Sequence, residues 1–332
     1  MIPEDLRILA MLDWLENDLL MTIIAFDPAS SDASFRRYFR VKTASGQYIV
    51  MDAPPDKENI EPFIRVAKLL RKAKVHVPDI FHINQSDGFL LLEDFGSDGF
   101  LDQLNSHTVE ALYESAFNSL LKLQVNIELE DCCLPHYNEA LLKRELNIFD
   151  EWFLGQSLDI QIPESIQKPV YELLIHSALE QPVTCVHRDF HSRNLMVLND
   201  NSPGILDFQD AVVGPITYDL VSLLRDCYIA WPEQQVLAWV SRYHHRLLQA
   251  GLIHCGIAPF KRWFDLMGMQ RHLKAIGIFS RLNLRDGKSS YLKDIPRTLN
   301  YVKTQAQAYP ELAQFSQFLD EQVLPLTHSI TA

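Results

Sequence analysis

The sequence has little glycine, little cysteine and no long apolar run. Its 332 residues include only 12 glycines, and none of them forms the G-x-G-x-x-G pattern of a glycine-rich phosphate loop. The 5 cysteines are odd in number and scattered, which argues against a disulfide framework and against a zinc site built from Cys-x-x-Cys pairs. No apolar stretch approaches the roughly 20 residues that span a bilayer. We therefore expect reduced thiols, a cytoplasmic location and no membrane partner.

Positive charge is also scarce. The chain has 30 Lys and Arg against 43 Asp and Glu, a net charge of −13. A nucleic-acid surface needs clustered Lys and Arg, so we expect no nucleic-acid partner. A nucleotide is compatible with this charge, because Mg²⁺ held by carboxylates can neutralise phosphates locally. The 47% apolar content is that of a globular protein, and the length favours two domains or one bilobed unit.

The first part of the chain, residues 1–95, is predicted to be mostly sheet. It opens with an amphipathic helix, which carries acids where a signal peptide carries positive charge. Two strands flank the turn at Gly46, and two more flank the turn that ends at Gly88. Between these pairs, residues 58–75 have the apolar spacing of a helix.

The remainder, residues 96–332, has mainly helical patterns with one interruption over residues 184–208. There, two short apolar runs flank NDNSP, which predicts a strand–turn–strand hairpin. A small antiparallel sheet lobe with one internal helix, followed by a large helical lobe with an embedded catalytic hairpin, is the layout of the protein-kinase-like fold. We predict a bilobal α+β protein with a nucleotide-binding domain over 1–95 and a helical domain over 96–332, and we expect a monomer or a weak dimer.

The hairpin is preceded by VHRDFHSRNLMV, which contains the pattern of a phosphoryl-transfer loop. In H-R-D-x-x-x-x-N the Asp accepts the proton of the acceptor hydroxyl and the Asn holds a metal ion. Asp189 and Asn194 match this spacing. After the hairpin, ILDFQD places Asp207 where kinases have the metal-binding Asp of D-F-G. The sequence therefore predicts a kinase that uses ATP and Mg²⁺.

Two other interpretations of this loop are open. His187, Asp189 and His191 would share one face of a strand and could hold a catalytic metal, but no second His or Cys pair completes such a site. A polar turn without chemistry would leave Asn194 and Asp207 unexplained. Arg188 and Arg193 can add positive charge near the transferred group, although Arg188 can equally pair with a structural acid.

The pattern H-x-D-x-H-x-x-N, with His191 as its second histidine, resembles that of the aminoglycoside phosphotransferases and choline kinases, which phosphorylate small molecules. The resemblance is closer still to the N-acetylmuramate/N-acetylglucosamine anomeric kinases of bacterial cell-wall recycling, and it covers nearly the whole chain. The segments that carry it include SDASFRRYFRV, GFLLLEDFG, GILDFQDAVVGPITYDLVSLLRD and MQRHLKAIGIFSRLNLRDGKSSYLKDIPRTL.

This resemblance implies transfer of phosphate from ATP to the C1 hydroxyl of an amino sugar. It makes Asp189 the base and Asn194 and Asp207 the Mg²⁺ ligands. The backbone from Glu93 to Phe95 would hydrogen-bond adenine at the joint between the lobes. The segment DPASSDASF is expected to be a loop, in which Ser31 and Ser34 present hydroxyl and N–H groups to the phosphates.

The chain departs from the kinase pattern in its small lobe. The strand that normally supplies a phosphate-binding Lys has Met51 and Asp52 instead. We expect a cation of FRRYFRVK to replace that lysine and favour Arg36, although each of these cations can equally be a solvated strand residue. Alternation places Arg36, Arg40 and Lys42 on one strand face and Arg37 on the other.

On the acceptor side, Arg271 and Lys274 lie three residues apart and share a helix face. With His191 and Arg193 they are the predicted acceptor-binding residues, since the lactyl carboxylate of N-acetylmuramate suits an arginine. Two alternatives remain. One is a kinase of the same fold acting on choline or an aminoglycoside, and the other is a nucleotide-binding pseudokinase scaffold, suggested by the missing lysine.

Overall fold

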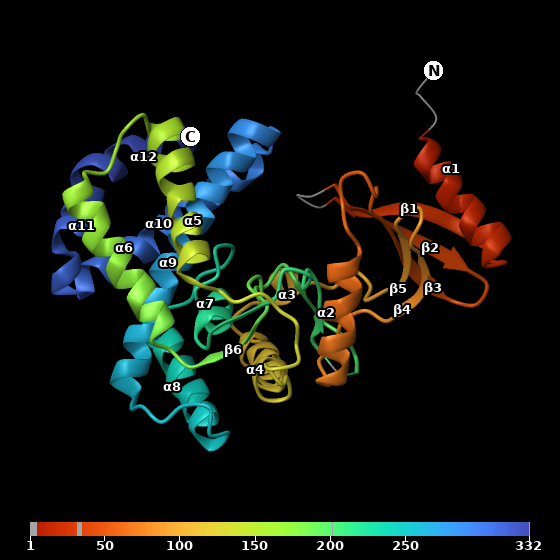
Figure 1. The fold of residues 1–332 in the computed structure, drawn as a ribbon, viewed down its shortest axis with the longest axis horizontal. Coiled ribbons are helices and arrows are strands. Elements are labelled where there is room, and N and C mark those ends of the chain that lie inside the picture. The colour runs from red at the N-terminus through yellow and green to blue at the C-terminus, as the bar shows by residue number, and fades with distance from the viewer. Residues whose placement is uncertain (1–4, 32–34, 201, 332) are drawn as a thin grey trace. The chain divides into compact units, whose positions relative to one another are not determined.

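The computed structural model describes residues 5–31, 35–200 and 202–331. The chain forms two compact units, which are described separately (Figure 1). The first comprises Met1–Asp98 and Met196–Gln209, and the second comprises Gly99–Leu195 and Asp210–Ala332. The predicted division into domains 1–95 and 96–332 stays a prediction. Among the described residues, no helix is both long enough and apolar enough to cross a bilayer.

The first unit is built on a five-stranded antiparallel sheet of order β1-β2-β3-β5-β4. The predicted hairpin at Gly46 is confirmed, because the Thr43 N–H donates to the Gly46 carbonyl over 2.9 Å. The elements of this unit are α1 (Leu6–Asp13), η1 (Trp14–Asp18), β1 (Ile23–Ser31), β2 (Arg37–Thr43), β3 (Gln47–Asp52), α2 (Glu61–Lys72), β4 (Ile80–Asn84), β5 (Phe89–Glu93) and β8 (Gly204–Ile205).

The segment DPASSDASF is predicted to be a loop, but its first five residues, 27–31, belong to β1, while residues 32–34 lie outside the described residues. β1 continues through Ser31, which pairs with Arg37 of β2. The loop prediction is therefore wrong for residues 27–31. β1 is an edge strand, where a proline costs no hydrogen bond of the ladder, and its register shifts between Pro28 and Ser30.

One face of the sheet is covered by α1 and η1, whose apolar side chains pack on alternate residues of β2, β3 and β5. The buried cluster consists of Met11, Trp14, Leu15, Phe39, Val41, Val50, Phe89 and Leu91. Figure 1 shows α2 on the opposite face of the sheet from α1. This burial fixes which side chains of β2 point toward α1, as the alternation predicted.

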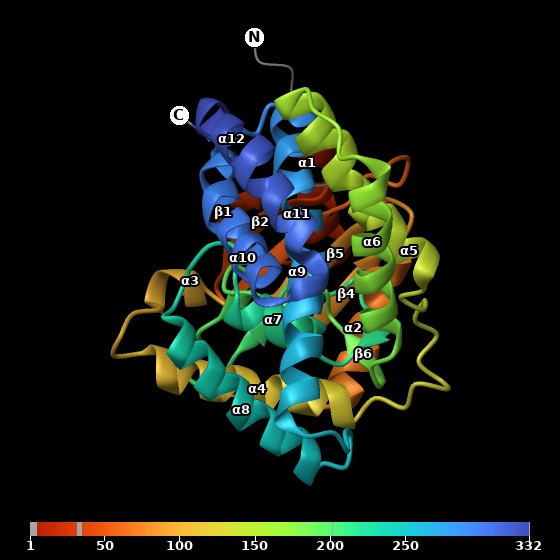
Figure 2. The same cartoon turned by 90° about the vertical axis from the view of Figure 1, so that its left-hand side faces the viewer.

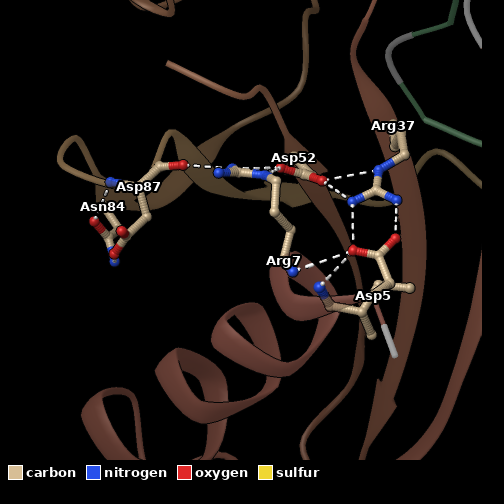
Figure 3. A network of polar contacts seen from close by, with 7 residues as sticks. Asp5, Arg7, Arg37, Asp52, Asn84 and Asp87 are labelled. Carbon is tan, nitrogen blue, oxygen red and sulfur yellow. Dashed lines mark hydrogen bonds and ion pairs between the residues drawn. The ribbon is translucent and has the colours of Figure 1, made fainter. Parts of the chain in front are cut away.

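A polar network ties α1 to the edge of this face (Figure 3). The Asp52 carboxylate is fully buried and accepts hydrogen bonds from Arg7 Nε over 2.8 Å and from Arg37 Nε over 2.9 Å. Arg37 also pairs with Asp5, the N-cap of α1, whose Oδ1 accepts the Arg7 N–H over 3.1 Å. Arg7 further donates to the carbonyl of Asp87. Asp52 lies on the strand that supplies the phosphate-binding lysine in kinases, and here it holds α1 against the sheet.

The second unit is mainly helical. Its elements are α3 (Phe100–Gln103), α4 (Val109–Val125), α5 (Glu139–Ile148), η2 (Phe149–Ser157), α6 (Glu164–Leu179), β6 (Val183–Val186), β9 (Val212–Pro215), α7 (Tyr218–Leu224), α8 (Glu233–Gln249), α9 (Ile257–Asp286), η3 (Ser289–Asp294), α10 (Ile295–Ala308), η4 (Pro310–Leu312), α11 (Ala313–Phe318), η5 (Leu319–Val323) and α12 (Leu324–Thr331). β7 (Leu195–Met196) lies where the chain crosses between the units and pairs with β8, so the predicted hairpin is confirmed.

α9 is the central helix of this unit, and Figure 2 shows it between α5, α6 and α10. A Cβ on Gly277 would lie only 2.5 Å from the carbonyl oxygen of Ile148, so this glycine lets α9 approach the end of α5 closely. The approach brings the buried face of α9, which includes Arg271 and Lys274, against α5 and α7. The position of these two cations thus follows from the packing of the helical core.

Candidate active site

The predicted catalytic loop connects β6 to β7 and is held in shape by its own side chains. His187 is fully buried, and its Nδ1 accepts the Asp189 N–H over 3.2 Å. Asn194 Nδ2 donates to the Asp189 carbonyl over 3.0 Å. Arg188 has a φ of 77°, a conformation that costs energy for a residue with a Cβ. His187 is therefore a structural residue of the loop, and the metal-hydrolase interpretation loses its first ligand.

Two buried aspartates hold the loop from outside. Asp219, in the first turn of α7, accepts the His187 N–H over 2.7 Å and the Arg188 N–H over 3.0 Å. Asp226 accepts the Ser192 N–H over 2.9 Å. Burial raises the pKa of Asp219 to about 7 in spite of these donors. The strained backbone around Arg188 is thus stabilised by the hydrogen bonds that it donates to Asp219 of a separate helix.

The Asp189 carboxylate is 37% exposed and lies among basic groups. Burial alone would raise its pKa, but four basic neighbours outweigh this effect, so that the pKa is below its usual range. In order of effect the neighbours are Lys274, His191, Arg271 and Arg188. The loop therefore presents an ionised carboxylate to solvent, which is the state a proton acceptor needs.

Glu145 of α5 organises two of these cations and was missed by the sequence reasoning. Its carboxylate is 3% exposed, pairs with Arg188, and lies 3.2 Å from Lys274 Nζ. It also accepts a hydrogen bond from the hydroxyl of Tyr137, and Lys274 donates to the hydroxyl of Tyr218 over 3.2 Å. Arg188 thus has the structural acid that the sequence left open. Only the fold brings α5, the loop and α9 together, so the sequence carried no local signal for Glu145.

The predicted acceptor residues His191, Arg193, Arg271 and Lys274 all lie in the same unit as Asp189. His191 Nε2 lies 4.0 Å from an oxygen of Asp189, and burial lowers the pKa of this histidine. Arg271 is 5% exposed and its guanidinium contacts the sulfur of Cys227 at 3.5 Å. Arg193 extends toward solvent over the ring of Tyr228. Whether these residues touch an acceptor stays a prediction.

The predicted metal ligands differ in their surroundings. Because Asn194 Nδ2 donates to a carbonyl, its amide oxygen is oriented away from that bond and can act as a ligand. Asp207 belongs to the first unit, has a φ of 61°, and accepts a hydrogen bond from Gln209 Nε2 over 2.7 Å. The described residues contain no group of three or more His, Cys, Asp or Glu that could hold a metal alone. An amide oxygen and a carboxylate are each a ligand type that suits Mg²⁺, which normally completes its shell with water and substrate phosphates. That the two residues hold one ion stays a prediction.

The cations proposed to replace the missing lysine have different partners. Arg37 points to the α1 face, where it pairs with Asp5 and Asp52. Arg40 is paired with Asp94 over 2.7 Å. Arg36 lies 3.8 Å from Glu58, an acid just before α2, so the pair resembles the Lys–Glu pair of protein kinases in its chemistry.

The remaining predicted nucleotide residues lie on β1 and at the end of β5. Ser31 belongs to β1, while Ser34 is outside the described residues. The Glu93 N–H already donates to the Asp79 carbonyl over 2.9 Å. Phe95 is buried against His76, and its ring lies so close to Gly204 that a Cβ there would be 2.5 Å away. Adenine would therefore have to use other backbone groups of the Glu93–Phe95 stretch.

Comparisons with known proteins agree on one protein family. The model of the phosphotransferase enzyme family matches residues 25–252. N-acetylmuramate/N-acetylglucosamine kinase of Pseudomonas putida is 42% identical over 96% of this chain and 98% of its own length. The enzymes of the same name from Pseudomonas aeruginosa and Neisseria meningitidis are 46% and 43% identical over 88% and 89% of this chain and over 87% and 90% of their own lengths.

Solved structures show the same fold at low sequence identity. Choline kinase from Streptococcus pneumoniae has a TM-score of 0.60 with 14% identity, covering 90% of this chain and 99% of that one. Plasmodium vivax ethanolamine kinase has a TM-score of 0.65 with 12% identity, covering 94% and 90%. An ADP-bound aminoglycoside phosphotransferase has a TM-score of 0.59 with 17% identity, covering 90% and 97%. The predicted bilobal α+β fold is confirmed, and the chain belongs to the phosphotransferase enzyme family, in the group of the N-acetylmuramate/N-acetylglucosamine kinases.

Proposed function

We propose that the protein transfers the γ-phosphoryl group of ATP to the C1 hydroxyl of N-acetylmuramate and N-acetylglucosamine, as a step of peptidoglycan recycling. One observation carries the proposal: three relatives that are 42–46% identical over at least 87% of both chains are named for these two sugars. The loop from His187 to Asn194 supplies the matching chemistry. The cytoplasmic location and the monomer or weak dimer stay predictions.

In this mechanism Asp189 accepts the proton of the sugar hydroxyl. The hydroxyl oxygen forms a bond to the γ-phosphorus, the bond from that phosphorus to the β–γ bridging oxygen breaks, and ADP leaves. The lowered pKa of Asp189 keeps it ionised before the reaction. Because the Asp189 backbone is tied to His187 and Asn194, the carboxylate is positioned in advance and little ordering is needed when the acceptor binds.

Asn194 and Asp207 would hold Mg²⁺, which when bound neutralises charge on the phosphates. Arg36, oriented by Glu58, would supply the positive charge that a kinase lysine normally brings. Backbone groups between Glu93 and Phe95 would bind adenine, and phosphate binding by Ser31 and Ser34 stays a prediction.

The acceptor and the site of phosphorylation can be tested together. ADP release with Mg–ATP is measured against N-acetylmuramate, N-acetylglucosamine, choline and kanamycin, and the product is examined by phosphorus NMR for coupling to the anomeric proton. We expect release with the two sugars and coupling to that proton. Release with choline or kanamycin alone would overturn the sugar assignment, and ATP binding without turnover on any acceptor would favour the scaffold alternative.

A further inference from the structure

Arg193 is a cation of the catalytic loop whose charge is incompletely neutralised. Its guanidinium carbon lies 3.6 Å from the ring centroid of Tyr228 and 5.4 Å from that of Tyr291. Among the described residues, one carboxylate lies within 4 Å of it, Asp294, at 3.9 Å, which is too far for a hydrogen bond. The side chain is 34% exposed, so solvent or a ligand can reach it. Stacking on Tyr228 holds the guanidinium in place and leaves its N–H edge available.

Asp294, at the end of η3, is an acceptor that also lacks a full set of partners. Its side chain is 6% exposed, and its Oδ1 accepts a hydrogen bond from Arg297 over 3.2 Å. Its Oδ2 is buried and accepts no hydrogen bond from the described residues. Burial raises the pKa of Asp294 although Arg193 and Arg297 oppose this effect. Because Asp294 and Arg193 are 3.9 Å apart, they do not satisfy each other by a hydrogen bond, and among the described residues the N–H edge of Arg193 stays available to a ligand.

This cluster adjoins the proposed base. The ring of His191 lies between them, with its Nε2 4.0 Å from Asp189 and its centroid 5.2 Å from that of Tyr228. Tyr228, Phe279 and Tyr291 form an aromatic wall, with centroid distances of 6.2 and 5.6 Å between successive rings. Asp189 and Arg193 are thus linked through His191 and Tyr228, and both side chains are partly exposed, at 37% and 34%.

The other predicted acceptor cations are less suited to meet a second charge. Lys274 is 9% exposed and already holds Glu145 and Tyr218. Arg271 is 5% exposed and packs against Cys227. Both act on Asp189 through their charge, whereas Arg193 is the basic predicted acceptor residue that reaches solvent.

We propose that Arg193 is the specificity residue that binds the carboxylate of an acidic amino sugar and so distinguishes it from a neutral one. The inference rests on the proposed function. A guanidinium already stacked in position can donate two hydrogen bonds to a carboxylate, and a sugar without that group leaves the contact unmade. Loss of Arg193 should therefore lower kcat/KM for N-acetylmuramate and change kcat/KM for N-acetylglucosamine little.

The test measures kcat/KM of the wild type, Arg193→Gln and Arg193→Lys with N-acetylmuramate, its methyl ester and N-acetylglucosamine. Arg285→Gln is the control, because Arg285 belongs to the same unit, has a 55% exposed side chain, and pairs with its neighbour Asp286 alone among the residues that the structure describes. We expect Arg193→Gln to lower kcat/KM for N-acetylmuramate by about 10- to 100-fold. The values for the ester and for N-acetylglucosamine should change little, and Arg193→Lys should recover part of the loss.

Each other outcome is decisive. Equal losses with all three sugars would overturn the inference, because Arg193 would then act on the reaction and not on the carboxylate. Unchanged values with N-acetylmuramate would overturn it as well. If the wild type phosphorylates neither sugar, the proposed function fails and this inference fails with it, which the wild-type measurement alone distinguishes from a failure of Arg193.

Discussion

Each of the two units contains a buried acid that pairs with two basic side chains, but the surroundings of these pairs differ. In the sheet unit, the buried Asp52 binds two arginines whose side chains are 30% and 38% exposed, and together they fasten α1 to the sheet. In the helical unit, the buried Glu145 binds a catalytic-loop arginine that is 17% exposed and the buried Lys274. Both of those cations lower the pKa of Asp189. An acid between two cations therefore stabilises one unit and, in the other, also sets the charge around a reactive group.

The two units also differ in what the loss of the acid does to its partner cations. The cations of Asp52 remain partly hydrated, so loss of the acid leaves them in water, where ion pairs contribute little. The cations of Glu145 are largely buried, so loss of the acid leaves unpaired charges inside the protein. Four predictions follow from this difference in burial and from the positions of the cations.

Of these four predictions, the largest effect is that of Glu145→Gln, which keeps the size of the side chain and removes its charge. The free energy of unfolding should fall by about 3 kcal/mol, because Arg188 and Lys274 lose their buried partner. The kcat should fall by at least about 10-fold, since Arg188 precedes Asp189 in the loop. Urea unfolding and steady-state kinetics measure the two effects.

Glu139→Gln is the matched control for this variant, because Glu139 lies exposed at the start of the same helix. Loss of stability with kcat unchanged would show that Glu145 serves folding alone, as Asp52 does, and the contrast between the units would disappear.

For Asp52→Asn the free energy of unfolding should fall by a smaller amount, about 2 kcal/mol, because the partner arginines are partly exposed. Thermal unfolding measures it. At temperatures well below the transition, kcat for the sugar should equal that of the wild type. A large fall in kcat without loss of stability would mean that Asp52 acts on the nucleotide and not on α1.

Among the cations of the sheet unit, Arg36→Gln should raise the KM for ATP by about 10-fold, if a charge-assisted contact to phosphate is lost. Arg40→Gln is the comparison, since Arg40 is held by Asp94 and by the carbonyl of Gly96. The KM for the sugar should remain constant in both variants. An equal rise of the KM for ATP in both variants would contradict the assignment of Arg36 to the phosphates.

The smallest effect is a shift of the pH profile. Because the pKa of Asp189 is lowered, kcat/KM should fall only at a pH below the usual Asp range, where this carboxyl becomes protonated. Lys274→Gln removes the cation with the largest effect, so the pKa of Asp189 rises and activity is lost at a higher pH than in the wild type. An acid limb at the same pH in both proteins would exclude this coupling.

The local parts of the site could be predicted from the sequence. Two short apolar runs around NDNSP predict the hairpin, which the pairing of β7 with β8 confirms. The spacing of Asp189, Asn194 and Asp207 predicts the catalytic loop and the metal site, and the roles of these residues stay predictions. Alternation separated Arg37 from Arg40, which the structure confirms along β2, since the period of a strand is fixed. Arg36 precedes β2 and is not placed by it. Such features depend on residues close in the chain.

The long-range parts could not be predicted. Glu145 and Asp226 read as ordinary polar residues, and they become part of the site because α5 and the segment after α7 pack against the loop. Residues 27–31 of β1 are predicted to be loop, whereas the outer edge of the sheet accommodates Pro28 in a strand. Tertiary packing decided each of these cases.

The central claim is that Asp189 accepts the proton of the sugar hydroxyl, and Asp189→Asn tests it most directly. The substitution keeps the backbone carbonyl that binds Asn194, so the loop should retain its shape. With N-acetylmuramate and saturating Mg–ATP, kcat should fall by about 10²- to 10⁴-fold while calorimetry shows unchanged affinity for ATP. A kcat within a few-fold of the wild type, at equal ATP affinity, would contradict the claim.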